Sequence, residues 1–179
     1  MSKNINSRKV ILGCRFSYLN CFEPHSINGD DPRYGLCAIV PKSDEKTISE
    51  INKAIEVAKK ESIAKWGFTP ENIKTPLRDG DVDFTDNEVY KSCYFFNANS
   101  KDAPQVVNCK VQHILDKNEI YSGCYGRISV TFYGYHVDGV YGIAAGLGNI
   151  QKIKDGKKLT NRVDAVDEFD MVEAEDFSW

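Results

Sequence analysis

YSGCYGRISVTFYGY, residues 121–135, is the stretch from which the fold of this 179-residue chain is best inferred. Its even-numbered positions are small or apolar, whereas its odd-numbered positions place tyrosines around Arg127. Because successive side chains of a β-strand point to opposite faces of a sheet, this alternation predicts one long strand with a packed face and a tyrosine-rich face. The glycines at 123, 126 and 134 would permit bends or bulges in so long a strand.

Other segments with the composition of strands lie on both sides of this stretch. Further strands are predicted at residues 34–40 and 90–98, and a final hairpin at 139–156. In residues 104–115, the odd positions are predicted to form a packed face that includes His113. In residues 9–23, alternation predicts a packed face made of Val10, Leu12, Cys14, Phe16 and Tyr18.

A single helix is predicted between the second and third strands, over about residues 47–66. Thr47 and Glu50 have the spacing of a capping box, and Gly67 marks the stop. Strands joined by turn-rich segments and interrupted by one helix are typical of a small barrel, which leaves no long sheet edge exposed. The sequence therefore predicts a mainly β fold, an OB-fold-like, five-stranded antiparallel β-barrel with one inserted α-helix.

The charge distribution separates the end of the chain from the rest. Residues 1–163 carry 23 basic and 19 acidic side chains, a net charge of +4, whereas residues 164–179 carry seven acidic side chains and no basic one. Like charges repel and build no core, so residues 164–179 are predicted to be a disordered acidic tail after one domain spanning residues 1–163. Phe177 and Trp179 suit docking into a pocket better than solubility.

Composition and motifs argue against several classes of protein. No apolar run approaches the roughly 18 residues of a membrane span, and the N-terminus lacks the apolar stretch of a secretory signal. The six cysteines form no CxxC pair, as expected for reduced thiols in a cytoplasmic protein. The chain contains no nucleophile elbow, HExxH motif or phosphate-binding loop, so we expect a non-enzymatic protein without a metal or other cofactor.

Carboxylates crowd the segment from Asp79 to Glu88, which is predicted to be a loop within residues 70–88. Clustered carboxylates can hold Mg²⁺ or Ca²⁺, although the D-G-D-V-D spacing is not that of an EF-hand. A metal-dependent nuclease is therefore one alternative, and a solvated turn is the interpretation we favour.

The tyrosine-rich face supplies the groups that bind single-stranded nucleic acid. Such strands are held by aromatic rings that stack on bases and by cations that follow the phosphates. The alternative is that these tyrosines pack beneath the helix with their hydroxyl groups at the rim. The candidate nucleic-acid contacts on this strand and on neighbouring polar faces are Tyr121, Tyr125, Arg127, Tyr133, Arg15 and Lys110.

Several motifs, in order along nearly the whole chain, resemble a family of phage-encoded single-stranded DNA-binding proteins. The motifs are RFSYLNCFEP at 15–24, IVPKSD at 39–44, PLRDGD at 76–81, YSGCYGRISVTFYGY at 121–135 and GIAAGLGNIQKIKDG at 142–156, followed by the acidic tail with its aromatic end. This resemblance implies an oligonucleotide-binding barrel that binds single-stranded DNA without sequence preference or catalysis, during phage replication or recombination.

The resemblance also implies roles for individual residues. In the tail, it implies that Asp176, Phe177 and Trp179 contact replication or recombination proteins. In the body, it makes candidate DNA contacts of Arg15, Tyr18, Phe22, Lys42, Arg78, Lys152 and Lys154. Alternation places Tyr18 on the packed face, so a structural role is the alternative for this residue.

The acidic tail allows a second hypothesis and an alternative function. A tethered polyanion with aromatic rings imitates single-stranded DNA and would compete for the cationic groove of its own barrel. Alternatively, the protein is a protein–protein adaptor or a DNA-mimic inhibitor that acts through this tail. A homodimer and a preference for DNA or RNA are both left open by the sequence.

Overall fold

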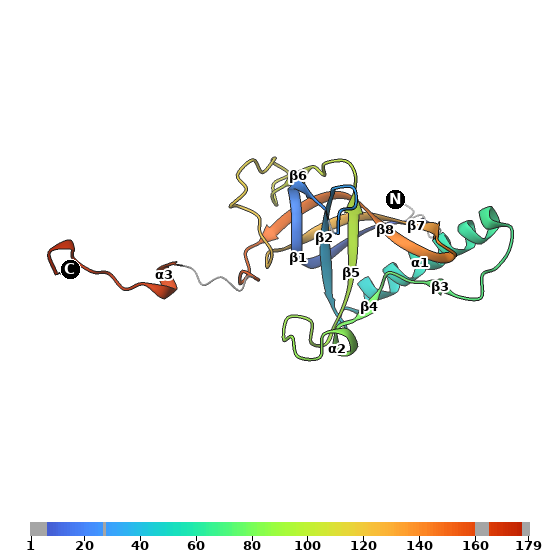
Figure 1. Ribbon diagram of the computed structural model, residues 1–179, viewed down its shortest axis with the longest axis horizontal. Coiled ribbons are helices and arrows are strands. Elements are labelled where there is room, and N and C mark those ends of the chain that lie inside the picture. The colour runs from blue at the N-terminus through green and yellow to red at the C-terminus, as the bar shows by residue number, and fades with distance from the viewer. Residues whose placement is uncertain (1–6, 27, 160–164, 177–179) are drawn as a thin grey trace.

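The computed structural model describes residues 7–26, 28–159 and 165–176. In this part of the chain, five long strands form a closed barrel (Figure 1). Antiparallel pairs join β1 to β2 and β7, β2 to β5, and β7 to β8. The barrel strands are β1 (Lys9–His25), β2 (Arg33–Pro41), β5 (Cys93–Ser100), β7 (Tyr125–Val137) and β8 (Val140–Lys154).

The predicted five-stranded barrel is confirmed, with one difference in how it closes. The closing contact between β5 and β8 is a short parallel pair that aligns Ala98 with Ala145. Sequence alternation predicts strands but not partners, so this parallel contact was not anticipated. The remaining short elements are β3 (Ile73–Lys74), β4 (Arg78–Asp79), α2 (Gly80–Asp83), β6 (Val106–Val107), α3 (Ala165–Glu168) and the 3₁₀ turn η1 (Ala174–Asp176).

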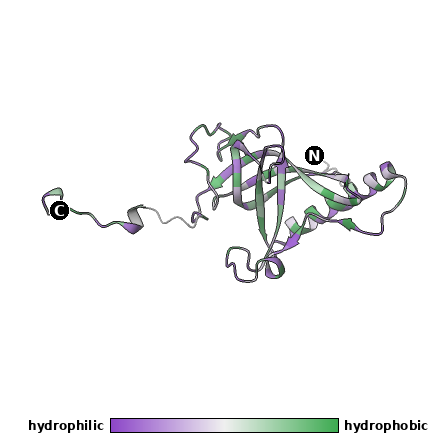
Figure 2. Ribbon diagram, viewed as in Figure 1, coloured by the Kyte–Doolittle hydropathy of each residue, from purple (hydrophilic) through white to green (hydrophobic). Residues whose placement is uncertain are grey.

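The barrel interior confirms the alternation read from β7. Ile128, Val130 and Phe132 are each at most 1% exposed, and they pack with Phe16 of β1 and Phe96 of β5. The strands of the barrel carry much of the hydrophobic sequence, and the loops that join them are largely hydrophilic (Figure 2). Burial of one face of each strand therefore drives closure of the sheet.

The helix α1 (Glu45–Trp66) packs against β1, β7 and β8. It begins two residues before the predicted start, because the Asp44 carboxylate accepts a hydrogen bond from the Thr47 N–H at 3.3 Å and caps the helix. The predicted Thr47 cap was therefore wrong. The predicted stop is confirmed, since Gly67 adopts a left-handed conformation at φ 80° and its N–H donates to the Ile63 carbonyl. No helix among the described residues is long and apolar enough to cross a membrane.

Two predicted strand faces were wrong. Tyr18 is 69% exposed rather than packed, because the pairing of β1 with β2 shifts register between Ser17 and Asn20. In residues 104–115, the structure has only the short β6, and Val111 and Leu115 are 70% and 87% exposed. The cause is a tight turn in which the Asn108 side chain accepts hydrogen bonds from the N–H groups of Lys110 and Gln112.

Residues 78–92 are more ordered than the predicted loop. They contain β4 and α2, and the predicted strand at 90–98 begins only at Cys93. Tyr90 and Phe84 pack over the outward side of β2 and β5, against Cys37 and Phe95, so this part of the barrel is covered on both faces. We call residues 78–92 the β2–β5 cover.

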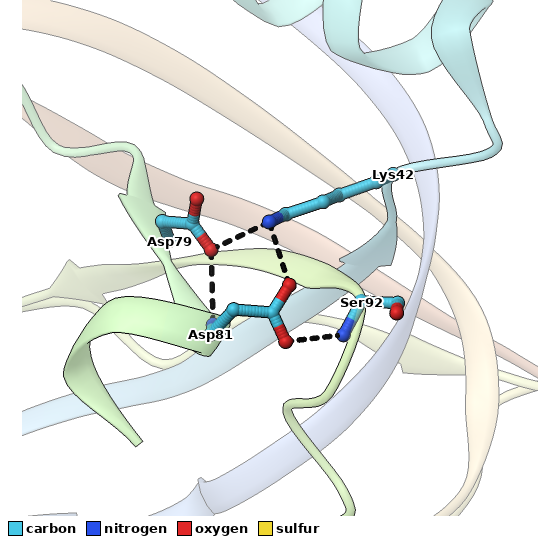
Figure 3. A network of polar contacts seen from close by, with 4 residues as sticks. All are labelled: Lys42, Asp79, Asp81 and Ser92. Atoms are coloured by element: carbon cyan, nitrogen blue, oxygen red, sulfur yellow. Dashed lines mark hydrogen bonds and ion pairs between the residues drawn. The ribbon is translucent and has the colours of Figure 1, made fainter. Parts of the chain in front are cut away.

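The β2–β5 cover is tied to the end of β2 by an ion-pair network (Figure 3). Lys42 Nζ lies 2.7 Å from both Asp79 Oδ1 and Asp81 Oδ2. The other oxygen of Asp81 accepts a hydrogen bond from the Ser92 N–H at 2.9 Å. These contacts hold both ends of the cover and fix one wall of the surface described next.

Candidate nucleic-acid interface

Among the described residues, three adjoining cavities form a groove across the outward side of β2 and β5 and on toward β1. Their volumes are about 600, 930 and 590 Å³. The first two share Arg33, Arg78, Asn97 and Asn99 in their walls. The second and third share Tyr18, Tyr90 and Ser122. We refer to this continuous surface as the groove.

The alternation of β2 and β5 explains the polar floor of the groove. On β5, Phe96 and Ala98 point into the core, so Asn97 and Asn99 point outward. Gly35 of β2 pairs with Asn99, and a Cβ added at Gly35 would lie 2.3 Å from Asn99 Oδ1. Glycine at this position therefore leaves space for the Asn99 side chain beside the strand.

Cationic side chains lie along the length of the groove. Lys74 and Arg78, on β3 and β4, and Arg33 at the start of β2 line the first cavity. Arg78 Nε lies 2.9 Å from Asp83 Oδ2, and its guanidinium carbon lies 5.4 Å from the centre of the Phe95 ring. At the other end, Arg15 and Lys157 line the third cavity.

The structure brings three of the sequence-predicted residues to this groove. Arg78 lines the first two cavities, Tyr133 lines the first, and Arg15 lines the third. The Tyr133 side chain is 37% exposed and stands on the outward side of β7, as alternation predicts.

Four further predicted residues lie beside the third cavity and, together with Arg15, form what we call the Tyr125 cluster. The Tyr125 ring lies between two cations, with Arg15 Cζ at 5.1 Å and Lys154 Nζ at 4.9 Å from its centre. Arg15 also donates hydrogen bonds to the carbonyls of Gly123 and Lys157, at 3.1 and 2.8 Å, which connects the cluster to the groove. The predicted residues of the cluster other than Arg15 are Tyr121, Tyr125, Lys152 and Lys154.

Tyr121 and Lys152 of the Tyr125 cluster, like Arg15, already have partners within the protein. The single Tyr121 hydroxyl proton has two acceptors within reach, Asp155 Oδ1 at 3.0 Å and the Gly156 carbonyl at 3.1 Å, and burial raises the pKa of Tyr121 to about 12. Lys152 Nζ lies 2.7 Å from Asp155 Oδ1, and the hydrogen bond from Lys152 lowers the pKa of Asp155. Tyr125 and Lys154 are therefore the more accessible members of the cluster.

The other predicted contacts do not line the groove. Phe22 packs against the core, and Lys110 lies in the exposed turn after β6. The Arg127 guanidinium donates two hydrogen bonds to Gln151 Oε1, at 2.9 and 2.6 Å. Lys42 is held by Asp79 and Asp81, and its hydrogen bonds to these carboxylates raise the pKa of Lys42.

Three carboxylates of the predicted metal segment pair with cations of the protein itself. Asp79 and Asp81 pair with Lys42, and Asp83 pairs with Arg78. The described residues contain no group of three or more histidine, cysteine, aspartate or glutamate side chains placed to hold a metal ion. The segment functions in the structure as part of the β2–β5 cover.

Sequence reasoning missed several residues of the groove. Asn97 and Asn99 could have been found, because the N-A-N alternation around buried Ala98 indicates a polar outward face. Arg33 could not have been found in this way, because it follows a turn-rich loop in which apolar and polar residues do not alternate. Tyr18 is a candidate from the RFSYLNCFEP motif, but alternation placed it on the wrong face because a register shift is not visible in alternation.

Comparison with known proteins gives consistent results. Residues 8–178 match the family described as "Enterobacter phage Enc34, ssDNA-binding protein". Protein p50 of Acyrthosiphon pisum secondary endosymbiont phage 1 is 32% identical over 169 residues, which cover 87% of this chain and 89% of that protein. The family resemblance read from the motifs is thereby confirmed.

Two solved structures have a similar fold. The single-stranded DNA-binding protein of bacteriophage Enc34, determined in complex with ssDNA, superposes with a TM-score of 0.77 at 23% identity, over 89% of this chain and 97% of that one. The single-stranded DNA-binding protein gp2.5 of bacteriophage T7 superposes with a TM-score of 0.61 at 15% identity, over 92% of this chain and 99% of that one. These likenesses show that the barrel architecture is shared.

Proposed function

The chain belongs to the family of the Enterobacter phage Enc34 single-stranded DNA-binding protein, and we propose that it binds single-stranded DNA in the groove across β2 and β5. The observation that carries this proposal is the continuous groove, whose walls hold cations, exposed aromatic rings and asparagine side chains. In small five-stranded barrels of this type, the face of the second and third strands binds oligonucleotides. Here those barrel strands are β2 and β5.

The groups in the groove suit binding without sequence preference. Arg33, Lys74 and Arg78 would contact phosphates at one end, and Arg15 at the other, while Tyr133 would stack on a base. Tyr125 and Lys154 would extend this surface past the third cavity. Lys42 and Arg127 do not line the groove and are bonded to Asp79, Asp81 and Gln151, so they are less available to a strand bound there.

The acidic tail would compete with DNA for this surface. Its described part is exposed, with Phe169, Met171 and Val172 at 71%, 93% and 64%, and Figure 1 shows α3 extending away from the barrel. Because the tail is tethered, it would have a high effective concentration at the groove and would leave when DNA binds. Phe177 and Trp179 lie outside the described residues, and Asp176 ends η1; together they would dock replication or recombination proteins of the phage.

A titration of labelled oligo-dT tests the binding proposal. The full chain and residues 1–163 would be compared at several salt concentrations, with a duplex of equal length as the control. All five barrel strands end before residue 160, so the truncated chain keeps them. We expect both forms to bind oligo-dT in preference to duplex, with the truncated form tighter at low salt and the difference lost at high salt.

Two other results would lead to different conclusions. Equal affinities of the two forms at every salt concentration would contradict competition by the tail but keep the binding proposal. If neither form bound single strands, the groove would not be a DNA site, and the tail would have to act through a protein partner, as in the adaptor alternative.

A further inference from the structure

Tyr18 has a backbone conformation that is unfavourable for its residue type. Its φ angle is 47°, in the left-handed region that residues other than glycine rarely adopt. The residue lies where the pairing of β1 with β2 shifts register, between Ser17 and Asn20. Bulges of this kind re-aim a side chain, and they often lie next to functional sites.

Specific contacts hold the bulge in place. The Leu19 N–H donates to Ser122 Oγ at 3.0 Å, and the Asn20 side-chain amide donates to the Tyr18 carbonyl at 3.2 Å. On either side, Ser17 and Cys21 are buried. The surrounding structure therefore maintains the strained backbone at one residue and keeps its neighbours packed.

The side chain that this bulge turns outward lies in the middle of the groove. Tyr18 lines both the second and the third cavities, between the end that carries Arg33 and Arg78 and the end that carries Arg15. Of the aromatic residues described in the walls of the three cavities, Tyr18 has the greatest exposure, at 69%, whereas Tyr90 and Phe95 are each 2% exposed.

We infer that Tyr18 is the central base-stacking residue of the groove, and that the strained bulge serves to present its ring. A strand whose phosphates follow the cations at both ends must pass this ring. An exposed aromatic face stacks on any base, which suits binding without sequence preference. This inference rests on the proposed function and assigns to it a residue that alternation had placed in the core.

Affinity and stability, measured together on the full chain, test the inference. The variants are Tyr18→Ala, Tyr18→Phe and Tyr18→Gly, and Phe68→Ala is the matched control, since Phe68 is 51% exposed and does not line the groove. Tyr18→Ala should weaken oligo-dT binding about 5- to 100-fold, the loss expected for one stacked base. Tyr18→Phe and Phe68→Ala should bind oligo-dT within about twofold of the wild type, because both variants keep an aromatic ring at position 18.

Two further readouts separate stacking from a structural role. The slope of log affinity against log salt should be unchanged in Tyr18→Ala, because a phenol ring neutralises no phosphate. Tyr18→Gly should lose about as much affinity as Tyr18→Ala, because both variants lack the ring. The Tm of Tyr18→Gly should equal or exceed that of the wild type, because glycine adopts this φ without strain.

Each outcome decides one claim. If the wild type binds oligo-dT and Tyr18→Ala binds as tightly, the inference fails and the proposed function stands. If affinity and Tm fall together in Tyr18→Gly, Tyr18 is structural and the inference also fails. If the wild type does not bind oligo-dT, the proposed function and this inference fail together.

Discussion

Lys42 Nζ lies 2.7 Å from Asp81 Oδ2 and thereby joins the end of β2 to the first turn of α2. Asp79 accepts from the same ammonium group, so one cation balances two carboxylates (Figure 3). This network fixes the β2–β5 cover, from which Arg78 and Tyr90 reach the groove. The IVPKSD motif indicates Lys42 as a DNA contact, and in the structure Lys42 has partners within the protein.

Replacing Lys42 with methionine should therefore affect the cover more than the phosphates. We expect Lys42→Met to lower the Tm, because Asp79 and Asp81 lose their counter-charge. The slope of log affinity for oligo-dT against log salt should stay at the wild-type value. A slope that falls by about 0.7 would instead show that Lys42 contacts a phosphate.

The same network predicts a stability change in acid. Hydrogen bonds from Lys42 and from the Ser92 N–H lower the pKa of Asp81 in the folded state. Its contribution to stability is thus present above the ordinary aspartate pKa of about 4 and is lost as pH falls below it. The difference in unfolding free energy between wild type and Asp81→Asn should shrink over this window in urea titrations.

The control for this acid effect is the same substitution in a Lys42→Met background. There the pH-dependent difference should be smaller, because the first cause of the lowered pKa has been removed. A difference of equal size in both backgrounds would contradict the assignment to Lys42.

The groove cations should each contribute to the salt dependence of binding. Arg33 and Arg78 are exposed at the end lined by β3 and β4. Replacing either with glutamine should reduce the magnitude of the salt slope by about 0.7, the value for one phosphate on a single strand. Lys59→Gln is the control, because Lys59 lies on α1 and pairs with Glu56. An unchanged slope in both arginine variants would place the phosphates elsewhere.

Much of the barrel could be predicted from local patterns, because burial alternates along each strand. Ile128, Val130 and Phe132 show this plainly, since they follow one another at every second position and all lie in the core. The end of the helix could also be predicted, because Gly67 adopts the left-handed conformation that ends it. What alternation cannot give is pairing, so the parallel contact of Ala98 with Ala145 and the register shift at Tyr18 came only from the structure.

The site was partly predictable for the same reason. Residue type identified Arg15, Arg78 and Tyr133, which lie in the groove. It could not show that Lys42 is held by two carboxylates outside the groove, or that Arg127 donates to Gln151 on the neighbouring strand. Those distinctions depend on residues far apart in sequence.

Tyr90 provides a prediction about alkaline stability. Its hydroxyl lies 3.0 Å from Ser17 Oγ, and both residues are buried, so Tyr90→Phe would leave the serine hydroxyl without this partner at a cost of about 1 kcal/mol near neutral pH. Burial raises the pKa of Tyr90 to about 12, above the ordinary tyrosine value of about 10. The unfolded state therefore loses its proton first, and wild-type stability falls as pH rises from about 10 to about 12.

Comparing the chain with and without Tyr90→Phe isolates this effect from other alkaline titrations. Burial also raises the pKa of Cys37 to about 11, and Tyr90 hydrogen-bonds to this thiol, so the comparison is made in a Cys37→Ala background that removes the thiol from both proteins. In urea unfolding at a series of pH values, the stability advantage of the protein with Tyr90 over its Tyr90→Phe variant should therefore shrink between pH 10 and pH 12. An advantage that stayed constant across this range would show that Tyr90 does not retain its proton preferentially in the folded protein.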